Sequence, residues 1–378
     1  MSIINYSITL LLFALQLFSA ANAATANHPK PRQYTNSTIN VGNGTELAYL
    51  DSGSPGTKTY TTIFAIHGMG YYSPVFQKVL AEASSHNTRF VAITRRDYNG
   101  STPYTSAELS TLQNGPDTAR SSFFQARGQE LATFIETFIS QNNIPAPSSD
   151  GKTGGVGVLG WSLGNTFSVS LLANIGTYSN STQQTLAKYV RATIFHEPPS
   201  VAFGLTLPPQ SWSPQIDTSI PENYRQPGFV QWITAYFQHG DLSTRNVDVL
   251  EFIQPSIAHV PSVFTMTQAQ LDGMTDVAAA DTGDTFIVGY SQAALLPIYK
   301  KAFYDETVRA AFPLMKALEF AGDITANFGI VALWQIEDDN TAAGGGFVTS
   351  KILTGTNHFV HWDNPTLALT TYLSAFSL

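Results

Sequence analysis

The sequence predicts an α/β fold in which a mostly parallel sheet is covered by helices on both faces. Four segments between residues 60 and 199 are continuously apolar, as strands buried on both faces are, and a segment with helical periodicity stands between the second and the third. The 378 residues, 43% of them hydrophobic and 12% charged, suit one large folded domain rather than a disordered chain.

The N-terminus has the features of a secretory signal peptide. An apolar stretch from Ile8 to Phe18 is followed by the small-residue site Ala21-Asn22-Ala23, so we expect residues 1–23 to be removed after Ala23. The stretch is short for a membrane span, and we expect no stable span after cleavage. Because no Lys or Arg precedes the stretch, an uncleaved anchor is the alternative.

Composition excludes several classes of function. The net charge is -8 and no basic cluster is present, so a nucleic-acid partner is not supported. The absence of cysteine excludes disulfides, thiolate zinc sites and a cysteine nucleophile. Sequons are compatible with a secreted glycoprotein, and they begin at Asn36, Asn43, Asn99 and Asn180.

The elements before residue 198 follow from apolar runs, periodicity and turn residues. A hairpin is expected over residues 34–52, where the chain turns at "GNGT". In chain order, we then expect a strand in "YTTIFAIHGMG", a strand in "RFVAITRRDYNGS", a helix over residues 117–142, a strand in "GVGVLGWS" and a strand in "YVRATIFHEPP".

The alternation of strands and helices stops after Pro198. Residues 198–312 are rich in proline and aromatic residues and contain only short helical fragments, which predicts a helical lid inserted into the core. The expected organisation is therefore a core in two parts, residues 24–197 and 313–378, with the lid between them.

One assignment near the C-terminus decides where a catalytic acid can lie. If "GIVALWQIED" were a strand, only about ten residues would separate it from the next strand, "FVTSKILTG", whereas parallel neighbours need a crossover of roughly a dozen or more. We therefore predict "LMKALEF", residues 314–320, as the penultimate strand and residues 325–338 as its crossover helix.

The stretch Gly160-Trp161-Ser162-Leu163-Gly164 stands between a predicted strand and a helical pattern. Small residues on both sides allow a tight, strained turn, which would present the Ser162 hydroxyl at the carboxyl end of the sheet, where open α/β folds bind ligands. The alternative is an ordinary glycine-rich turn. A serine alone is a weak nucleophile, so the chain must also supply a base.

Four pieces in this order resemble the α/β-hydrolase superfamily, and the resemblance runs from about residue 34 to the C-terminus. The pieces are "HGMG" after an early strand, "GWSLG" at the strand-to-helix turn, the lid, and "GTNHFVHWDNP" after the last strand. The resemblance implies an α/β-hydrolase fold in which Ser162 is the nucleophile. It also favours His358, which stands directly before an aromatic residue, as the base, with His361 as the competitor.

The acid is the least constrained member of the triad. In most of the superfamily it lies on a turn after the penultimate strand, but here that turn carries Thr325 in the expected place. A second position, after the preceding core strand, is used by some lactone-hydrolysing members and corresponds to Glu197. We predict Glu197 as the acid, with Asp323, Asp338 and Asp339 as alternatives.

The oxyanion hole is expected to use backbone N–H groups of Leu163 and of the Gly68-Met69 turn. His67 is then a structural residue that supports this turn. In the resemblance, Arg95 and Asp97 brace the loop after the following strand.

A serine at the turn disfavours the aspartate-nucleophile chemistry of epoxide hydrolases and haloalkane dehalogenases in this superfamily. The resemblance implies an acyl-enzyme and no cofactor, and the apolar lid favours a hydrophobic ester or lactone as substrate. Other chemistry on the same triad, such as carbon–carbon hydrolysis, a lyase reaction or perhydrolysis, remains open, as does a non-catalytic binding protein. The predicted lid aromatics are Phe203, Trp212, Tyr224, Phe229, Trp232, Tyr236, Phe237, Phe252 and Phe264.

Overall fold

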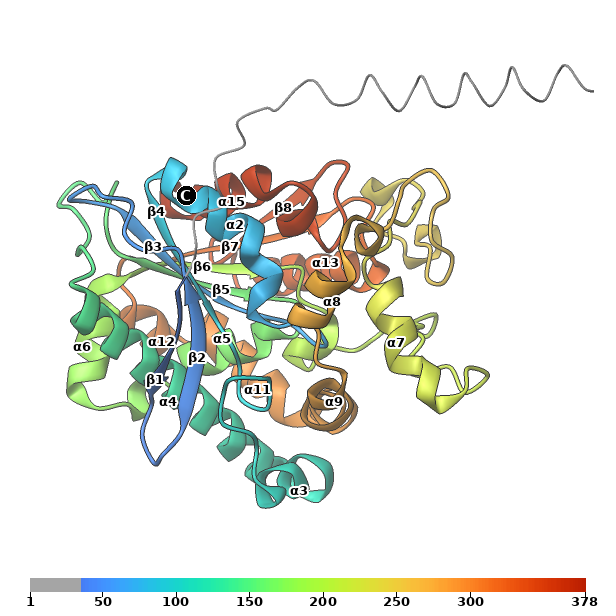
Figure 1. Cartoon of the computed structure of the whole chain (residues 1–378), viewed down its shortest axis with the longest axis horizontal. Helices are drawn as coiled ribbons and strands as arrows, with labels where there is room; N and C mark the ends of the chain where they lie inside the picture. Colours follow the sequence, from blue (N-terminus) through green and yellow to red (C-terminus); the bar gives the residue numbers. More distant parts are fainter. Residues whose placement is uncertain (1–34) are drawn as a thin grey trace, which may run out of the picture. The chain divides into compact units, whose positions relative to one another are not determined.

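A computed structural model describes residues 35–378, so the predicted signal peptide lies outside the described residues. An eight-stranded sheet in the order β1-β2-β4-β3-β5-β6-β7-β8 lies at the centre (Figure 1). Neighbouring strands from β4 to β8 pair in parallel, whereas the pairs β1–β2 and β2–β4 are antiparallel, which confirms the predicted mostly parallel sheet. The strands are β1 (Thr35–Asn40), β2 (Glu46–Asp51), β3 (Thr61–Ile66), β4 (Thr88–Ile93), β5 (Val156–Trp161), β6 (Val190–His196), β7 (Lys316–Gly322) and β8 (Thr349–Leu353).

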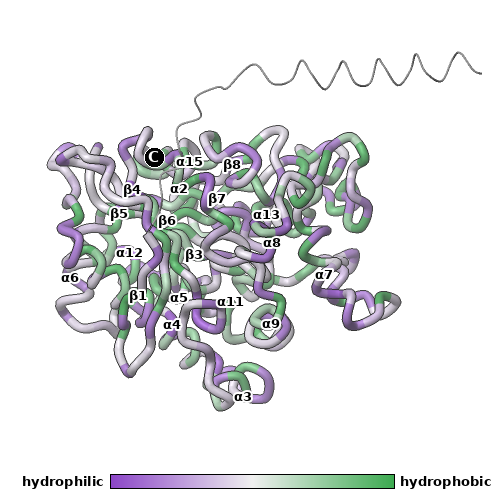
Figure 2. The backbone as a smooth tube through the Cα atoms, viewed as in Figure 1, coloured by the Kyte–Doolittle hydropathy of each residue, from purple (hydrophilic) through white to green (hydrophobic). Residues whose placement is uncertain are grey.

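The continuous apolar runs form the central strands. Every residue of β3, β4, β5 and β6 is buried, as expected for strands that are covered on both faces. By contrast, β1 lies at the edge and exposes five of its six residues, which are mostly polar. Figure 2 shows hydrophobic residues gathered along the central strands and hydrophilic residues in the peripheral turns.

Helices cover both faces of the sheet (Figure 1). One face packs against α4 (Asp117–Asn142), α5 (Gly164–Ala173) and α11 (Gln292–Tyr304), and the other packs against α2 (Gln77–Glu82) and α15 (Pro365–Ser374). The helix predicted over residues 117–142 is therefore confirmed. It buries Phe124, Phe134 and Phe138 completely, and each such side chain contributes roughly 1.5–3 kcal/mol on burial.

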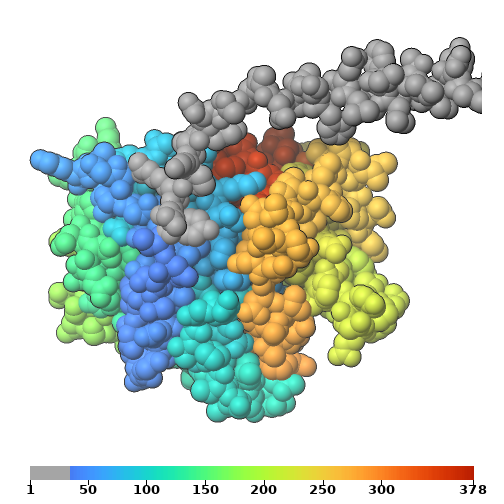
Figure 3. Space-filling view, viewed as in Figure 1, coloured from blue at the N-terminus to red at the C-terminus, as the bar shows by residue number. Residues whose placement is uncertain are grey.

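The chain between β6 and β7, residues 197–315, is here called the β6–β7 segment. No strand of the sheet lies in this fully described range, and Figure 3 shows much of the segment, coloured yellow to orange, gathered on one side of the visible face. Its helices are α7 (Glu222–Trp232), α8 (Gln268–Met274), α9 (Val277–Ala279), a π-helix (Ala280–Asp284), α10 (Thr285–Tyr290), α11 and α12 (Glu306–Ala311).

The assignment near the C-terminus is confirmed. β7 pairs in parallel with both β6 and β8, and the residues of "GIVALWQIED" lie in helix α13 (Asn327–Ala342). β7 begins at Lys316 rather than at residue 314, because the chain turns first, with the Met315 N–H donating to the carbonyl of Phe312. The remaining helices are α3 (Ser106–Asn114), α6 (Asn180–Tyr189) and α14 (Val360–Asp363). Within residues 35–378, no helix has the length and apolar character needed to cross a membrane.

Candidate active site

Ser162 lies on a strained turn between β5 and α5. Its φ is 54°, a left-handed value that non-glycine residues adopt at a cost and that clusters at functional sites. The turn is so tight that a Cβ on Gly164 would stand 2.2 Å from the carbonyl oxygen of Ile66, and one on Gly68 would stand 2.7 Å from the Ser162 Cβ. Glycine is therefore required at both positions, and the Ser162 hydroxyl is presented at the carboxyl end of the sheet.

His358 and Glu197 meet beside this turn. His358 Nδ1 lies 2.6 Å from Glu197 Oε2, and both side chains are buried. Glu197 follows β6 directly and has a left-handed φ of 45°. Its carboxylate also accepts the Gly322 N–H at 2.7 Å and the Thr325 hydroxyl at 2.6 Å, so three donors fix its position. The structure thus brings together the two residues that the sequence analysis names as base and acid.

The second ring nitrogen of His358 is left free. Because an ionised carboxylate only accepts, Nδ1 carries the proton and Nε2 is the basic atom. Nε2 is buried and has no hydrogen-bond partner among the described residues. The imidazole packs against the indole of Trp161, the residue before Ser162, at a centroid distance of 5.1 Å, and the Trp161 Nε1–H donates to the His358 carbonyl.

The alternative acids lie elsewhere. Asp323 accepts the Gly355 N–H, Asp338 pairs with Arg245, and Asp339 pairs with Lys300. Thr325, which occupies the usual place of the acid, instead donates to Glu197. The structure therefore brings Glu197, and none of the three aspartates, into hydrogen-bond contact with His358.

His361, the alternative base, is fully buried between rings. Its centroid lies 5.0 Å from that of Phe76 and 4.5 Å from that of Trp161, and it makes no hydrogen bond among the described residues. Burial, and secondarily the neighbouring His358, lower its pKa well below the usual range. It has no carboxylate to orient it, which distinguishes it from His358.

The turn predicted to supply the oxyanion hole is held by buried polar contacts. The His67 Nε2 accepts the Arg95 N–H, so His67 has the supporting contacts that the sequence predicts. The Arg95 guanidinium donates to the carbonyls of His67 and Gly68. Burial, followed by the Arg95 charge, lowers the pKa of His67 well below its usual range, which keeps the ring neutral.

A residue that the sequence does not single out completes this arrangement. Asp284, at the end of the π-helix, accepts two hydrogen bonds from Arg95, at 2.8 and 2.7 Å, and one from the Tyr98 hydroxyl. The Tyr98 oxygen in turn accepts the Gly70 N–H at 2.9 Å. The β6–β7 segment is thus tied to the turn over residues 67–70 through a buried ion pair.

A cavity of about 240 Å³ opens over Ser162. Met69 and Leu163 line it together with Ser162, and none of its lining side chains carries a charge. Of the predicted lid aromatics, Trp212, Phe229 and Trp232 line the cavity. Phe203, Phe237 and Phe252 are instead buried in the core, whereas Tyr224 and Phe264 are exposed.

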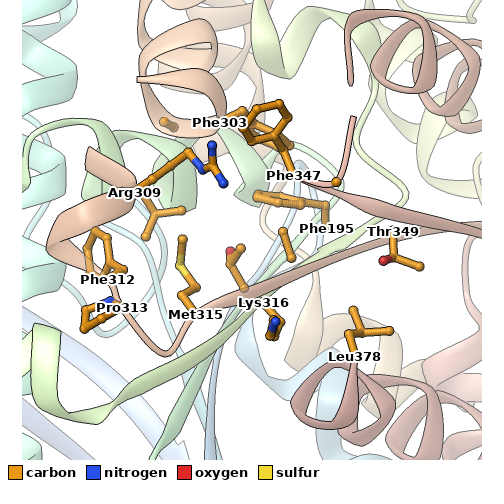
Figure 4. Close-up of a pocket in the computed structure, with 15 residues that line it drawn as sticks. Phe195, Phe303, Arg309, Phe312, Pro313, Met315, Lys316, Phe347, Thr349 and Leu378 are labelled. Carbon is orange, nitrogen blue, oxygen red and sulfur yellow. The ribbon is translucent and has the colours of Figure 1, made fainter. Parts of the chain in front are cut away.

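A second, larger cavity of about 420 Å³ lies away from this site (Figure 4). It is lined by the first residues of β7 and β8, Lys316 and Thr349, so it opens near the ends of the strands opposite to Ser162. Arg309 stacks over Phe347 there at 3.9 Å. Among residues 35–378, no group of three or more His, Asp or Glu side chains is placed to hold a metal ion.

Comparisons with known proteins identify the fold. No protein-family model matches the sequence, and no curated protein matches it. Many solved structures match, and three examples have TM-scores of 0.50 to 0.52. A laboratory-evolved variant of potato epoxide hydrolase has a TM-score of 0.51 at 13% identity, over 89% of this chain and 97% of that chain.

Two further examples have similarly low sequence identity. A mutant of the epoxide hydrolase from Solanum tuberosum has a TM-score of 0.50 at 13% identity, over 89% of this chain and 97% of that chain. A mutant of VrEH2, crystallised as a complex, has a TM-score of 0.52 at 11% identity, over 91% and 98%. These proteins are members of the α/β-hydrolase superfamily. With its mostly parallel eight-stranded sheet and comparable extent, this chain has the α/β-hydrolase fold.

Proposed function

We propose that this protein is a secreted serine hydrolase that cleaves a carboxylic ester or lactone of an uncharged, hydrophobic small molecule. The observation that carries the proposal is the buried His358–Glu197 pair. The Nε2 atom of His358 has no partner among the described residues, and its ring packs against Trp161, the residue before the strained Ser162. A binding protein without catalysis has no use for this combination of strain and an oriented, unpartnered base.

In the proposed reaction, the Ser162 oxygen attacks the ester carbonyl carbon while His358 Nε2 takes the hydroxyl proton. Glu197 holds the tautomer and stabilises the imidazolium. The backbone N–H groups of Leu163 and the Gly68-Met69 turn would stabilise the oxyanion. When the carbonyl re-forms, the alcohol leaves with the proton from His358. Water then attacks the acyl-enzyme, with His358 again as base, and releases the acid and free Ser162.

The cavity supports the substrate class. An uncharged lining that includes Trp212, Phe229 and Trp232 disfavours a charged ligand, because burying an unpaired charge is costly. Two of the matched structures described above are epoxide hydrolases, and superfamily members with that activity use an aspartate nucleophile. The serine in this chain favours acyl transfer instead.

Secretion is supported by the surface. The sequon asparagines Asn36, Asn43, Asn99 and Asn180 are all exposed, as glycosylation requires. Expression in a eukaryotic secretory host should therefore give a protein that begins at Ala24 and shifts in mass on glycosidase treatment. An intracellular, unmodified product that retains residues 1–23 would contradict this part of the proposal.

A fluorophosphonate probe tests the chemistry directly, because it labels only an activated serine. The wild type should be labelled at Ser162, and Ser162→Ala should not be labelled although it folds normally. Aryl esters of graded acyl length and simple lactones then define the substrate. Absence of both labelling and turnover in the folded wild type would refute the hydrolase proposal and leave a binding role.

A further inference from the structure

The start of α13 lies against Glu197 and His358 and borders the cavity over Ser162. Thr325, just before the helix, donates to Glu197, and the Phe328 ring packs edge-on against the His358 ring at a centroid distance of 5.2 Å. A Cβ on Gly329 would stand 3.5 Å from Glu197 Oε2. Asn327, between these residues, lines the cavity that contains Ser162.

Asn327 has a donor without a partner. The residue is 3% exposed, and its Nδ2 is buried with no hydrogen bond among the described residues. Buried amide groups are nearly always paired, and an unpaired donor is destabilising. The helix end adds to this polarity, because the N-cap residue Ala326 provides no side-chain hydrogen bond.

The other polar side chains around the cavity differ from Asn327. Gln215 already donates to the Gln226 amide oxygen at 2.6 Å, and the Thr285 hydroxyl donates to the carbonyl of Ala280. Ser211 and Ser213 also line the cavity but are only half-buried. Apart from Ser162 itself, Asn327 is thus the lining residue that combines near-complete burial with an unpartnered donor within the described part of the chain.

We propose that Asn327 is a specificity-determining residue that donates a hydrogen bond to an acceptor oxygen on the alcohol part of the substrate. This inference rests on the proposed ester hydrolysis. Phe328, the next residue, packs against His358, and His358 delivers the proton to the leaving alcohol, so Asn327 lies on the alcohol side of the scissile bond. The favoured substrate is therefore an ester whose otherwise apolar alcohol carries a second, ether-like or carbonyl oxygen.

The test compares esters that differ by one oxygen. The 2-methoxyethyl and 3-methoxypropyl esters of one acid match the butyl and pentyl esters in length but add an acceptor. For at least one pair, the wild type should show a kcat/KM about tenfold higher for the ether ester, the ratio expected of one ordinary hydrogen bond. Asn327→Leu, which keeps the branched arrangement of side-chain heavy atoms, should bring that ratio to about one and still cleave the alkyl ester.

Two further measurements separate this inference from the proposed function. Gln215→Met changes the same cavity but removes an amide already engaged, so the ether preference should persist. The same ester pairs titrated against Ser162→Ala, with and without Asn327→Leu, report the preference without turnover. An equal kcat/KM for both esters in the wild type, or an unchanged ratio in Asn327→Leu, would overturn the role of Asn327. This holds even if the probe labels Ser162 and the protein hydrolyses esters.

Discussion

Replacing Glu197 by Gln changes one oxygen of the site to nitrogen, and the surrounding donors decide which one. Oε1 accepts the backbone N–H of Gly322 at 2.7 Å, and a backbone N–H can only donate. The Gln carbonyl must therefore occupy that position, which turns its NH₂ group toward Thr325 and His358. The Thr325 hydroxyl can rotate to accept, but His358 can accept only if its proton moves from Nδ1 to Nε2.

The consequence is a histidine in the wrong tautomer. Nε2 would then carry a proton and could not take another from Ser162, and the developing imidazolium would lose its carboxylate. In serine triads, an amide in place of the carboxylate lowers kcat by about 10⁴-fold, which corresponds to about 5.4 kcal/mol of transition-state stabilisation. The shape of the site is retained, so KM should change far less than kcat.

Initial rates on an aryl ester, with the melting temperature as a check of folding, measure this effect. Glu319→Gln is the matched control, because Glu319 is also fully buried and its only side-chain hydrogen bond among the described residues is from Ser350. Burial raises the pKa of Glu319 well above its usual range, which favours the neutral carboxyl and makes Gln a close substitute. A Glu197→Gln protein that retains more than a tenth of wild-type kcat would refute the assignment, as would an equal loss in Glu319→Gln.

Three more outcomes are expected. Ser162→Ala should lower kcat on the order of 10⁶-fold without loss of folding, as measured by single-turnover kinetics. Asp284→Ala, which leaves the buried Arg95 without its partner, should cost about 3–5 kcal/mol of unfolding free energy in urea, whereas Glu337→Gln, at an exposed ion pair, should cost less than about 1 kcal/mol. The free energy of unfolding should also fall as the pH drops below about 6.5. Buried histidines with a lowered pKa stay neutral in the folded protein, whereas the same histidines bind protons in the unfolded chain. Each such histidine contributes up to about 1.4 kcal/mol per pH unit. His361→Leu should make this slope in urea titrations shallower, and an unchanged slope would contradict the burial argument. The histidines concerned are His67, His196 and His361.

The parts of the fold that the sequence predicts are those fixed by local patterns. Continuous apolar runs locate β3 to β6, and the length that a parallel crossover requires correctly makes α13 a helix. The start of β7 is displaced because Leu314 belongs to a turn and remains 46% exposed, although its apolar character suits a strand. Composition alone cannot distinguish an apolar residue in a turn from one in the strand that follows.

In the candidate site, too, the sequence predicts what depends on local pattern and misses what depends on tertiary contacts. Ser162, Glu197 and His358 each end or follow a strand, so the predicted strands and the superfamily resemblance could name them, although three aspartates remained as alternatives to Glu197. The role of Thr325 could be predicted only in part: the sequence shows that it cannot replace a carboxylate, whereas its donation to Glu197 depends on a side-chain rotamer. Thr325, which lacks the expected carboxylate, thereby stabilises the carboxylate of Glu197.

The sequence does not predict the role of Asp284. Its bond to Arg95 joins residues 189 positions apart, and the β6–β7 segment around it has no periodicity that would place it. Its importance comes from burial: both partners have side chains only 2% exposed, so neither charge can be left alone at low cost. Since Arg95 also holds the carbonyls of His67 and Gly68, any displacement of Asp284 away from the core breaks the pair and frees the turn beside Ser162. The segment that contributes most of the cavity lining and the turn proposed to stabilise the oxyanion are therefore linked by the same ion pair.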